Sequence, residues 1–185
     1  MENFKNMKKL ILALFVILSS NYARADLFKS TLFSLNTIYV DRDYTDNGVK
    51  SQSKETDTDF RLTRIEKNWS YGVVYALSSN DASVSNRTSY GLSVGYFSDK
   101  DFYLNLNYFL SSKYSLGSGT EYSRGGGYEF DLGFLSKVTA SFYVGIALAI
   151  KNFTYSEQTS GGVTSSVSAT HKDVLPMFTF AVDFM

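Results

Sequence analysis

Residues 102–110 read FYLNLNYFL, and this short stretch separates two fold classes. An extended chain turns successive side chains to opposite sides, so the stretch has two distinct faces. One face collects the apolar and aromatic residues Phe102, Leu104, Leu106, Tyr108 and Leu110. The other face carries Asn105 and Asn107. If the apolar face covers a protein core, the asparagines meet water. If it meets lipid, they line an interior and the protein spans a membrane.

The same alternation recurs in seven further segments, which gives an even number of predicted strands. Their apolar positions are Phe33, Leu35, Thr37 and Tyr39; Phe60 and Leu62; Trp69, Tyr71, Val73, Tyr75 and Leu77; Tyr90, Leu92, Val94 and Tyr96; Tyr128, Phe130, Leu132 and Phe134; Phe142, Val144, Ile146, Leu148 and Ile150; and Phe178, Phe180, Val182 and Phe184. Fourteen Tyr, fifteen Phe and a single Pro also favour sheet. The sequence therefore predicts an all-β protein.

The connections between the segments alternate between long and short. The long ones, residues 43–57, 79–86, 111–126 and 156–172, are polar and predicted as loops. The short ones, residues 66–68, 98–101 and 136–140, are predicted as tight turns. All long connections fall at one end of the strands, which is typical of a bacterial outer-membrane barrel with exterior loops and periplasmic turns. We expect an eight-stranded antiparallel up-and-down transmembrane β-barrel.

The face opposite the apolar one indicates which side meets lipid. It is rich in small residues such as Gly72, Gly91 and Gly145, which suit the crowded inside of a narrow barrel. It also holds charges, whereas the apolar face of the third to eighth segments has none. We expect the inward polar residues to form a lumen network. Its predicted members are Asp59, Arg61, Asn105, Asn107, Glu129 and Asp131.

Aromatic residues on the apolar face gather at two levels, as two bilayer interfaces would select. The girdle predicted beside the long connections contains Tyr39, Tyr75, Tyr90, Tyr108 and Tyr128. The girdle predicted beside the short turns contains Trp69, Tyr71, Tyr96, Phe102, Phe134, Phe142 and Phe184.

The first 25 residues have the pattern of a cleaved secretory signal peptide, with early lysines, an apolar run from Leu10 to Leu18 and a small-residue ending at Ala25. The predicted barrel domain is residues 26–185. Removing residues 1–25 takes four of eighteen basic and one of eighteen acidic residues, so the mature chain is slightly acidic. That balance gives no reason to expect nucleic acid as a partner. The chain has no cysteine, which excludes disulfides and a lipoprotein anchor.

The strand and loop pattern resembles the small eight-stranded outer-membrane proteins of the OmpA-barrel and OmpX type, although no diagnostic motif carries the likeness. The closing FTFAVDFM is similar to that family's assembly signal at Phe180, Val182 and Phe184, although Met185 follows the last aromatic. The resemblance implies a porin-like cell-surface protein of a Gram-negative outer membrane. It also implies a monomer whose partners are outer-membrane lipids, lipopolysaccharide and the outer-membrane assembly machinery.

Three motifs that could carry chemistry are better explained without it. GLSVG at residues 91–95 matches a hydrolase motif, but Ser93 falls inside a predicted strand and no helix follows. The glycines of residues 117–127 lack the Lys-Ser/Thr pair of a phosphate loop. His171, the only histidine, falls in a predicted loop. We therefore expect no catalytic, cofactor-binding or metal-binding residues.

Eight strands enclose a space that side chains can fill, so a wide pore is not expected. The sequence predicts a non-enzymatic outer-membrane protein that displays four extracellular loops for envelope integrity, adhesion or surface interaction. Three alternatives remain open. They are a lipid-modifying enzyme that uses His171 at the barrel rim, a narrow low-conductance channel, and a soluble secreted β-barrel.

Overall fold

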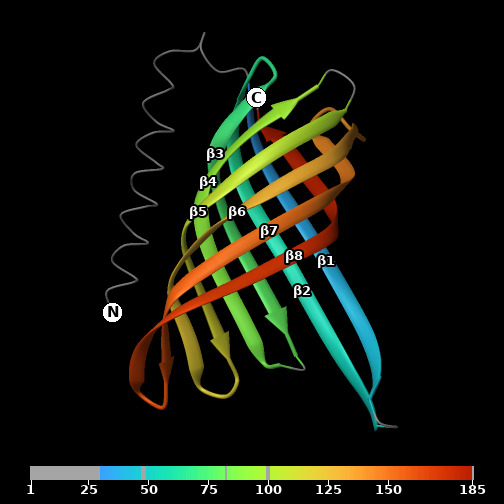
Figure 1. The fold of residues 1–185 in the computed structure, drawn as a ribbon. Coiled ribbons are helices and arrows are strands. Elements are labelled where there is room, and N and C mark those ends of the chain that lie inside the picture. The colour runs from blue at the N-terminus through green and yellow to red at the C-terminus, as the bar shows by residue number, and fades with distance from the viewer. Residues whose placement is uncertain (1–29, 47–48, 82, 99–100, 185) are drawn as a thin grey trace.

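The computed structural model describes residues 30–46, 49–81, 83–98 and 101–184, with the side chains of residues 41–53 excluded. The predicted signal peptide, residues 1–25, lies outside the described residues. Eight strands form one closed antiparallel barrel in which each strand pairs with its neighbours in sequence and β1 pairs with β8 (Figure 1). The strands are β1 (Ser30–Asp46), β2 (Val49–Glu66), β3 (Trp69–Asn80), β4 (Ser85–Phe97), β5 (Phe102–Leu116), β6 (Thr120–Lys137), β7 (Phe142–Ser160) and β8 (Val163–Phe184). The predicted fold class is confirmed. None of the described residues forms a helix long and apolar enough to cross a membrane.

Three of the four long polar connections, residues 43–57, 111–126 and 156–172, are mostly strand, and their prediction as loops is wrong; in the fourth, β3 ends at Asn80 and β4 begins only at Ser85. Residues 111–126, for example, continue β5 to Leu116 and begin β6 at Thr120, which leaves a three-residue turn. The β7–β8 hairpin closes at Gly161 and Gly162, both with positive φ, where glycine has no steric penalty. Cross-strand hydroxyl pairs such as Thr159 with Thr164, 2.9 Å apart, support these polar ladders. In Figure 1 the hairpins occupy the lower end of the barrel and the C-terminus the upper end.

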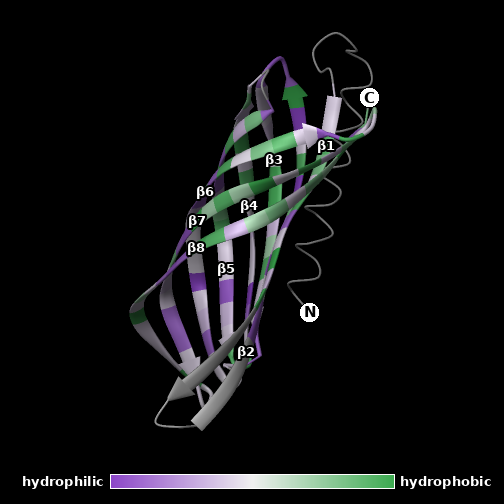
Figure 2. Cartoon of the chain, turned by 90° about the vertical axis from the view of Figure 1, so that its right-hand side faces the viewer, coloured by the Kyte–Doolittle hydropathy of each residue, from purple (hydrophilic) through white to green (hydrophobic). Residues whose placement is uncertain are grey.

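The two faces of the wall alternate as the sequence predicts. On β4 every second residue from Ser85 to Gly95 is buried, and the residues between them are exposed. Figure 2 shows hydrophobic positions gathered in the upper part of the barrel and hydrophilic ones towards the hairpins. We call the part of the wall between the two predicted girdles, where the outward-facing residues are apolar, the belt. All twelve predicted girdle residues face outwards; eleven are exposed and Phe142 is half-buried.

Glycines in the belt permit close contact between neighbouring backbones. A Cβ on Gly91 of β4 would overlap the carbonyl oxygen of Tyr108 on β5, beside an irregularity in the β4–β5 register. A Cβ on Gly145 of β7 would overlap the carbonyl oxygen of Phe134 on β6. A larger residue at either position would therefore collide with the backbone of the adjacent strand, which is a constraint separate from the narrowness of the interior.

The seam where β1 meets β8 is short. Seven registered pairs join Thr31–Thr37 to Phe184–Phe178. Beyond this seam β1 continues to Asp46 beside β2 alone, and β8 extends back to Val163 beside β7 alone. The barrel wall is thus closed from the end with short turns as far as Thr37 and Phe178, and it parts towards the hairpins.

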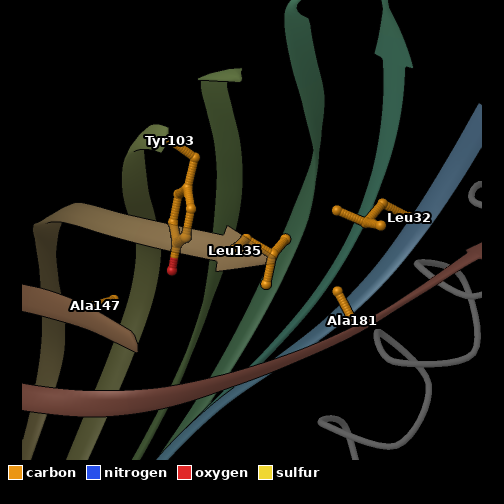
Figure 3. Close-up of a cluster of buried hydrophobic side chains, with 5 residues drawn as sticks. All are labelled: Leu32, Tyr103, Leu135, Ala147 and Ala181. Carbon is orange, nitrogen blue, oxygen red and sulfur yellow. The ribbon is translucent and has the colours of Figure 1, made fainter. Parts of the chain in front are cut away.

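Side chains fill the interior at the end with short turns. Leu32, Tyr103, Leu135, Ala147 and Ala181 are buried together, and each comes from a different strand. Figure 3 shows Leu32, Leu135 and Tyr103 directed into the space enclosed by the wall. The Tyr103 hydroxyl lies 3.0 Å from the hydroxyl of Thr179, so this polar group has a partner in the apolar layer.

Candidate functional site: a charged network inside the barrel

Arg61 of β2 lies at the centre of the interior and is almost completely buried. Its guanidinium donates to Glu129 Oε1 at 2.9 Å and to Asp131 Oδ2. Glu129 and Asp131 are two residues apart on β6, so the period of a strand places both carboxylates on the inward face. One arginine therefore links β2 to β6 across the barrel.

Lys151 of β7 forms the second centre of charge. Its ammonium donates to both carboxylate oxygens of Asp59, at 2.7 and 2.9 Å, and to Asp57 Oδ1. The same ammonium lies 3.6 Å from Glu129 Oε2, which is too far for a hydrogen bond but close enough for attraction. Lys151 thus connects the β2 carboxylates to those of β6.

Arg87 of β4 continues these ionic contacts towards the hairpins. It lies 3.2 Å from Asp57 Oδ2 and 2.9 Å from Asp173 Oδ2 of β8. Its guanidinium also stacks over the ring of Phe153, 4.3 Å from the centroid, a favourable cation–π geometry. Asp173 in turn lies 3.0 Å from His171 Nε2.

We call this set of linked side chains the network. Its described members are five carboxylates, three basic groups and one histidine: Asp57, Asp59, Glu129, Asp131, Asp173, Arg61, Arg87, Lys151 and His171. Taking charges out of water is expensive, and a buried pair is tolerated only when its geometry compensates. Breaking such a network leaves uncompensated buried charge. The network therefore makes the positions of β2, β4, β6, β7 and β8 interdependent.

Amide side chains complete the surroundings of Arg61. With their oxygens turned towards the guanidinium, Asn36 accepts at 2.8 Å from Nη1 and Asn107 accepts at 3.2 Å from Nε. Asn105, the other predicted asparagine, is also buried, but its Oδ1 has no hydrogen-bond partner. It occupies the space that the missing side chain of Gly95 leaves on the neighbouring strand. The prediction that Asn105 would hydrogen-bond across the interior is wrong for this oxygen.

The structure brings the six predicted lumen residues to the interior and adds members that the sequence analysis did not place there. Asp57 and His171 fall in stretches predicted as loops, and Arg87 and Asp173 each directly follow one. Lys151 has the inward parity of Gly145 on β7, but it is not among the predicted lumen residues. The missed signal is continued alternation, because Asp57 has the same parity as Asp59 and Arg61.

His171 lies in β8 with its side chain partly exposed, so its prediction as a loop residue is wrong. Its ring lies 5.5 Å from that of Tyr114 on β5. Tyr114 also packs against Tyr122 of β6 and Tyr155 of β7, so an aromatic cluster lies on the hairpin side of the network. Ser112 bonds the Tyr155 hydroxyl at 2.9 Å, and among the described residues no serine forms a hydrogen bond with His171. The described part of the chain therefore offers no Ser–His pair.

One further motif has a structural role. Ser93 of GLSVG is buried in the middle of β4, where the chain is extended and makes no turn. Within the described part of the chain no group of three or more His, Cys, Asp or Glu residues has the arrangement of a metal site.

Comparison with known proteins supports the fold. Neisserial surface protein A has a TM-score of 0.50 and 12% identity, over 83% of this chain and 97% of that one. The outer membrane protein OprG from Pseudomonas aeruginosa gives a TM-score of 0.44 and 12% identity, over 85% and 96% of the two chains. No protein-family model and no curated protein matches the chain. The fold predicted by resemblance to small outer-membrane barrels agrees with the first of these structures.

Proposed function

We propose that the protein is a non-enzymatic integral barrel of a Gram-negative outer membrane whose wall holds four extracellular hairpins. The observation that carries the proposal is the belt. Large apolar side chains such as Leu106, Ile146 and Phe178 are exposed on the outside of a wall whose inside is polar and charged. A water-soluble barrel has the opposite arrangement, since burial of apolar surface drives its folding.

The filled interior supports a role other than a general pore. An apolar layer around Leu32, Tyr103 and Leu135 occupies one end, and the network with Phe109 and Phe153 occupies the middle. An eight-stranded barrel has little interior space beyond what side chains take up. The proposed role is therefore carried by surfaces: the belt towards lipid, and the hairpins towards the exterior.

The proposed biogenesis follows from the two ends of the sequence. Residues 1–25 direct export and are removed, and Phe180, Val182 and Phe184 are read by the outer-membrane assembly machinery. The mature monomer contacts outer-membrane lipids and lipopolysaccharide. Envelope integrity, adhesion or another surface interaction is the process to which the hairpins contribute.

Membrane fractionation with heat-modifiable gel migration tests this proposal. We expect the protein in the outer-membrane fraction, with one mobility before boiling and another after it, because a lipid-embedded barrel resists detergent until heated. A soluble periplasmic protein from the same cells serves as the fractionation control. Recovery of the protein with that control, or a mobility unchanged by boiling, would contradict the proposal.

A further inference from the structure

The seam between β1 and β8 parts beside the single proline of the chain. Pairing ends at Thr37 with Phe178, and the same register would place Tyr39 opposite Pro176. Proline has no N–H to donate to a ladder, so it is found where a sheet edge is not continued. The parting therefore has a local cause in the sequence. It begins at the level of the predicted outer girdle, to which Tyr39 belongs.

An apolar groove of about 710 Å³ lies across the wall at this point. Tyr39 of β1 and Pro176 and Phe178 of β8 form one side, and Leu132, Phe134 and Leu148 of β6 and β7 form the other. The volume is within the range of small-ligand sites, about 300 to 1,000 Å³. The groove opens on the belt, so its surroundings are the acyl chains of the membrane.

The inside of the wall at the seam is also apolar. Ile38, Ala149, Leu175 and Met177 pack together, with Val40 against them. Ile38 and Met177 line the groove as well, so apolar surface continues from the belt to the interior. The network lies beside this cluster, since Ile38 pairs with Asp57 and Ala149 with Asp131.

A positive charge lies on the hairpin side of the groove. Lys172 of β8 is exposed and has the parity of Pro176, so it faces outwards about 13 Å further along the strand, at ~3.3 Å per residue. The outward residues of β8 from Lys172 to Phe184 include no carboxylate. Lys172 would therefore attract an anionic headgroup at the outer interface, and no carboxylate on this face of β8 competes with it.

We propose that the groove at the β1–β8 seam binds one acyl chain of an anionic outer-leaflet lipid, with its headgroup beside Lys172. The chain runs from Tyr39 and Pro176 along the belt towards Phe134. The site adds to the proposed function: it requires the barrel to lie in a membrane, and it does not depend on what the hairpins bind.

Tryptophan fluorescence quenched by brominated lipid tests this site, because Trp69 is the only native tryptophan. Trp69→Phe removes that signal, and Tyr39→Trp then places a reporter on the groove. Tyr108→Trp, in the same predicted girdle but outside the groove, is the matched control. Both proteins are reconstituted in phosphatidylcholine vesicles that contain increasing fractions of brominated phosphatidylglycerol, and heat-modifiable migration confirms their folding.

We expect the groove reporter to be quenched at lower fractions of the brominated lipid than the control. In parallel titrations, brominated phosphatidylglycerol should quench this reporter at about one fifth of the lipid fraction that brominated phosphatidylcholine requires. A fivefold difference is the size of effect expected of one lysine at a membrane surface. Lys172→Gln should abolish this preference, whereas Lys137→Gln, at the end with short turns, should leave it unchanged.

Filling the groove supplies a second, independent measurement. Ile146→Phe adds volume within the groove, and Val94→Phe adds the same kind of volume to the belt on β4. The first should return the groove reporter to the control's quenching curve, and the second should not. Identical quenching of the Tyr39→Trp and Tyr108→Trp reporters at every lipid fraction would overturn the proposal. Excess quenching that survives Ile146→Phe would do so as well.

Discussion

The belt half and the hairpin half of the barrel are built from the same eight strands but are constrained differently. In the belt, the outward side chains are apolar and exposed and the inward ones form close contacts, so Leu106 and Asn107 both have a required character. In the hairpins, polar residues face outwards and hydroxyl pairs such as Thr159 with Thr164 join the strands. Strand pairing thus persists where both faces are polar, while side-chain identity is constrained where the outward face is apolar or the inward face holds buried charge.

Removing Arg61 should have the largest effect, because it leaves Glu129 and Asp131 as buried charges without their shared partner. We expect Arg61→Met to lower the free energy of unfolding by about 3 to 5 kcal/mol. Urea unfolding in lipid vesicles, followed by gel mobility, measures it.

The matched control is Lys113→Met in the hairpin half, where Lys113 pairs with Glu121 at 3.2 Å on the surface. That change should stay within about 1 kcal/mol. Equal effects of the two substitutions would show that the network does not distinguish the belt from the hairpins.

A positive charge on the outside of the wall should be the next most harmful change. Leu106→Arg places a guanidinium in the middle of the belt and should lower the free energy of unfolding by about 2 to 4 kcal/mol. Ser168→Arg, on the outward face of β8 in the hairpin half, should have little effect. The fraction of heat-modifiable protein in isolated outer membranes gives a cellular readout. Equal tolerance of the two changes would place the membrane somewhere other than the belt.

Backbone proximity predicts a smaller difference between two glycines. Gly91→Ala forces a Cβ against the Tyr108 carbonyl oxygen in the belt, and should destabilise by about 1 to 3 kcal/mol through overpacking. Gly126→Ala, nearer the hairpins, meets only the Phe109 carbonyl oxygen at 3.1 Å and should cost less. The midpoints of urea unfolding rank the two. A larger loss at Gly126 would reverse the inferred order.

Shortening a hairpin should have the smallest effect. Replacing residues 156–168 with Asn-Gly joins the paired residues Tyr155 and Ala169 through a favoured two-residue turn. We expect insertion and heat-modifiable migration to persist, with unfolding changed by no more than about 1 kcal/mol, because these are surface residues. Failure to insert would show that the β7–β8 hairpin helps to assemble the belt.

Alternation made the belt predictable from sequence. A side chain's parity assigns its face, and the outward-facing residues from Phe102 to Leu110 are strongly apolar. The hairpins were not predictable in the same way, since polar residues occupy both faces of residues 156–172 and erase the signal. Their Ser, Thr and Gly content is also typical of loops, and only pairing with the adjacent strand reveals extension.

The network was predictable in part for a related reason. Parity places Arg61, Glu129 and Asp131 on the inside, but it does not give their heights, which depend on the stagger between strands around the barrel. Arg87 and Asp173 reach the network because β4 and β8 extend past the belt. Those extensions belong to the hairpins, where the sequence does not alternate. The sequence therefore predicted neither the hairpin strands nor the place of Arg87 and Asp173 in the network.

The short seam has a consequence for how the chain reaches its native state. All other backbone pairings between the strands of the barrel join consecutive strands. The seven pairs between Thr31–Thr37 and Phe178–Phe184 instead join the two ends of the domain. Contacts of such large sequence separation form slowly because the intervening chain must first be ordered. Hairpins can therefore form early, and closure waits for the last strand. A chain that stops before Phe178 should accumulate paired hairpins with two open edges, a state prone to aggregation.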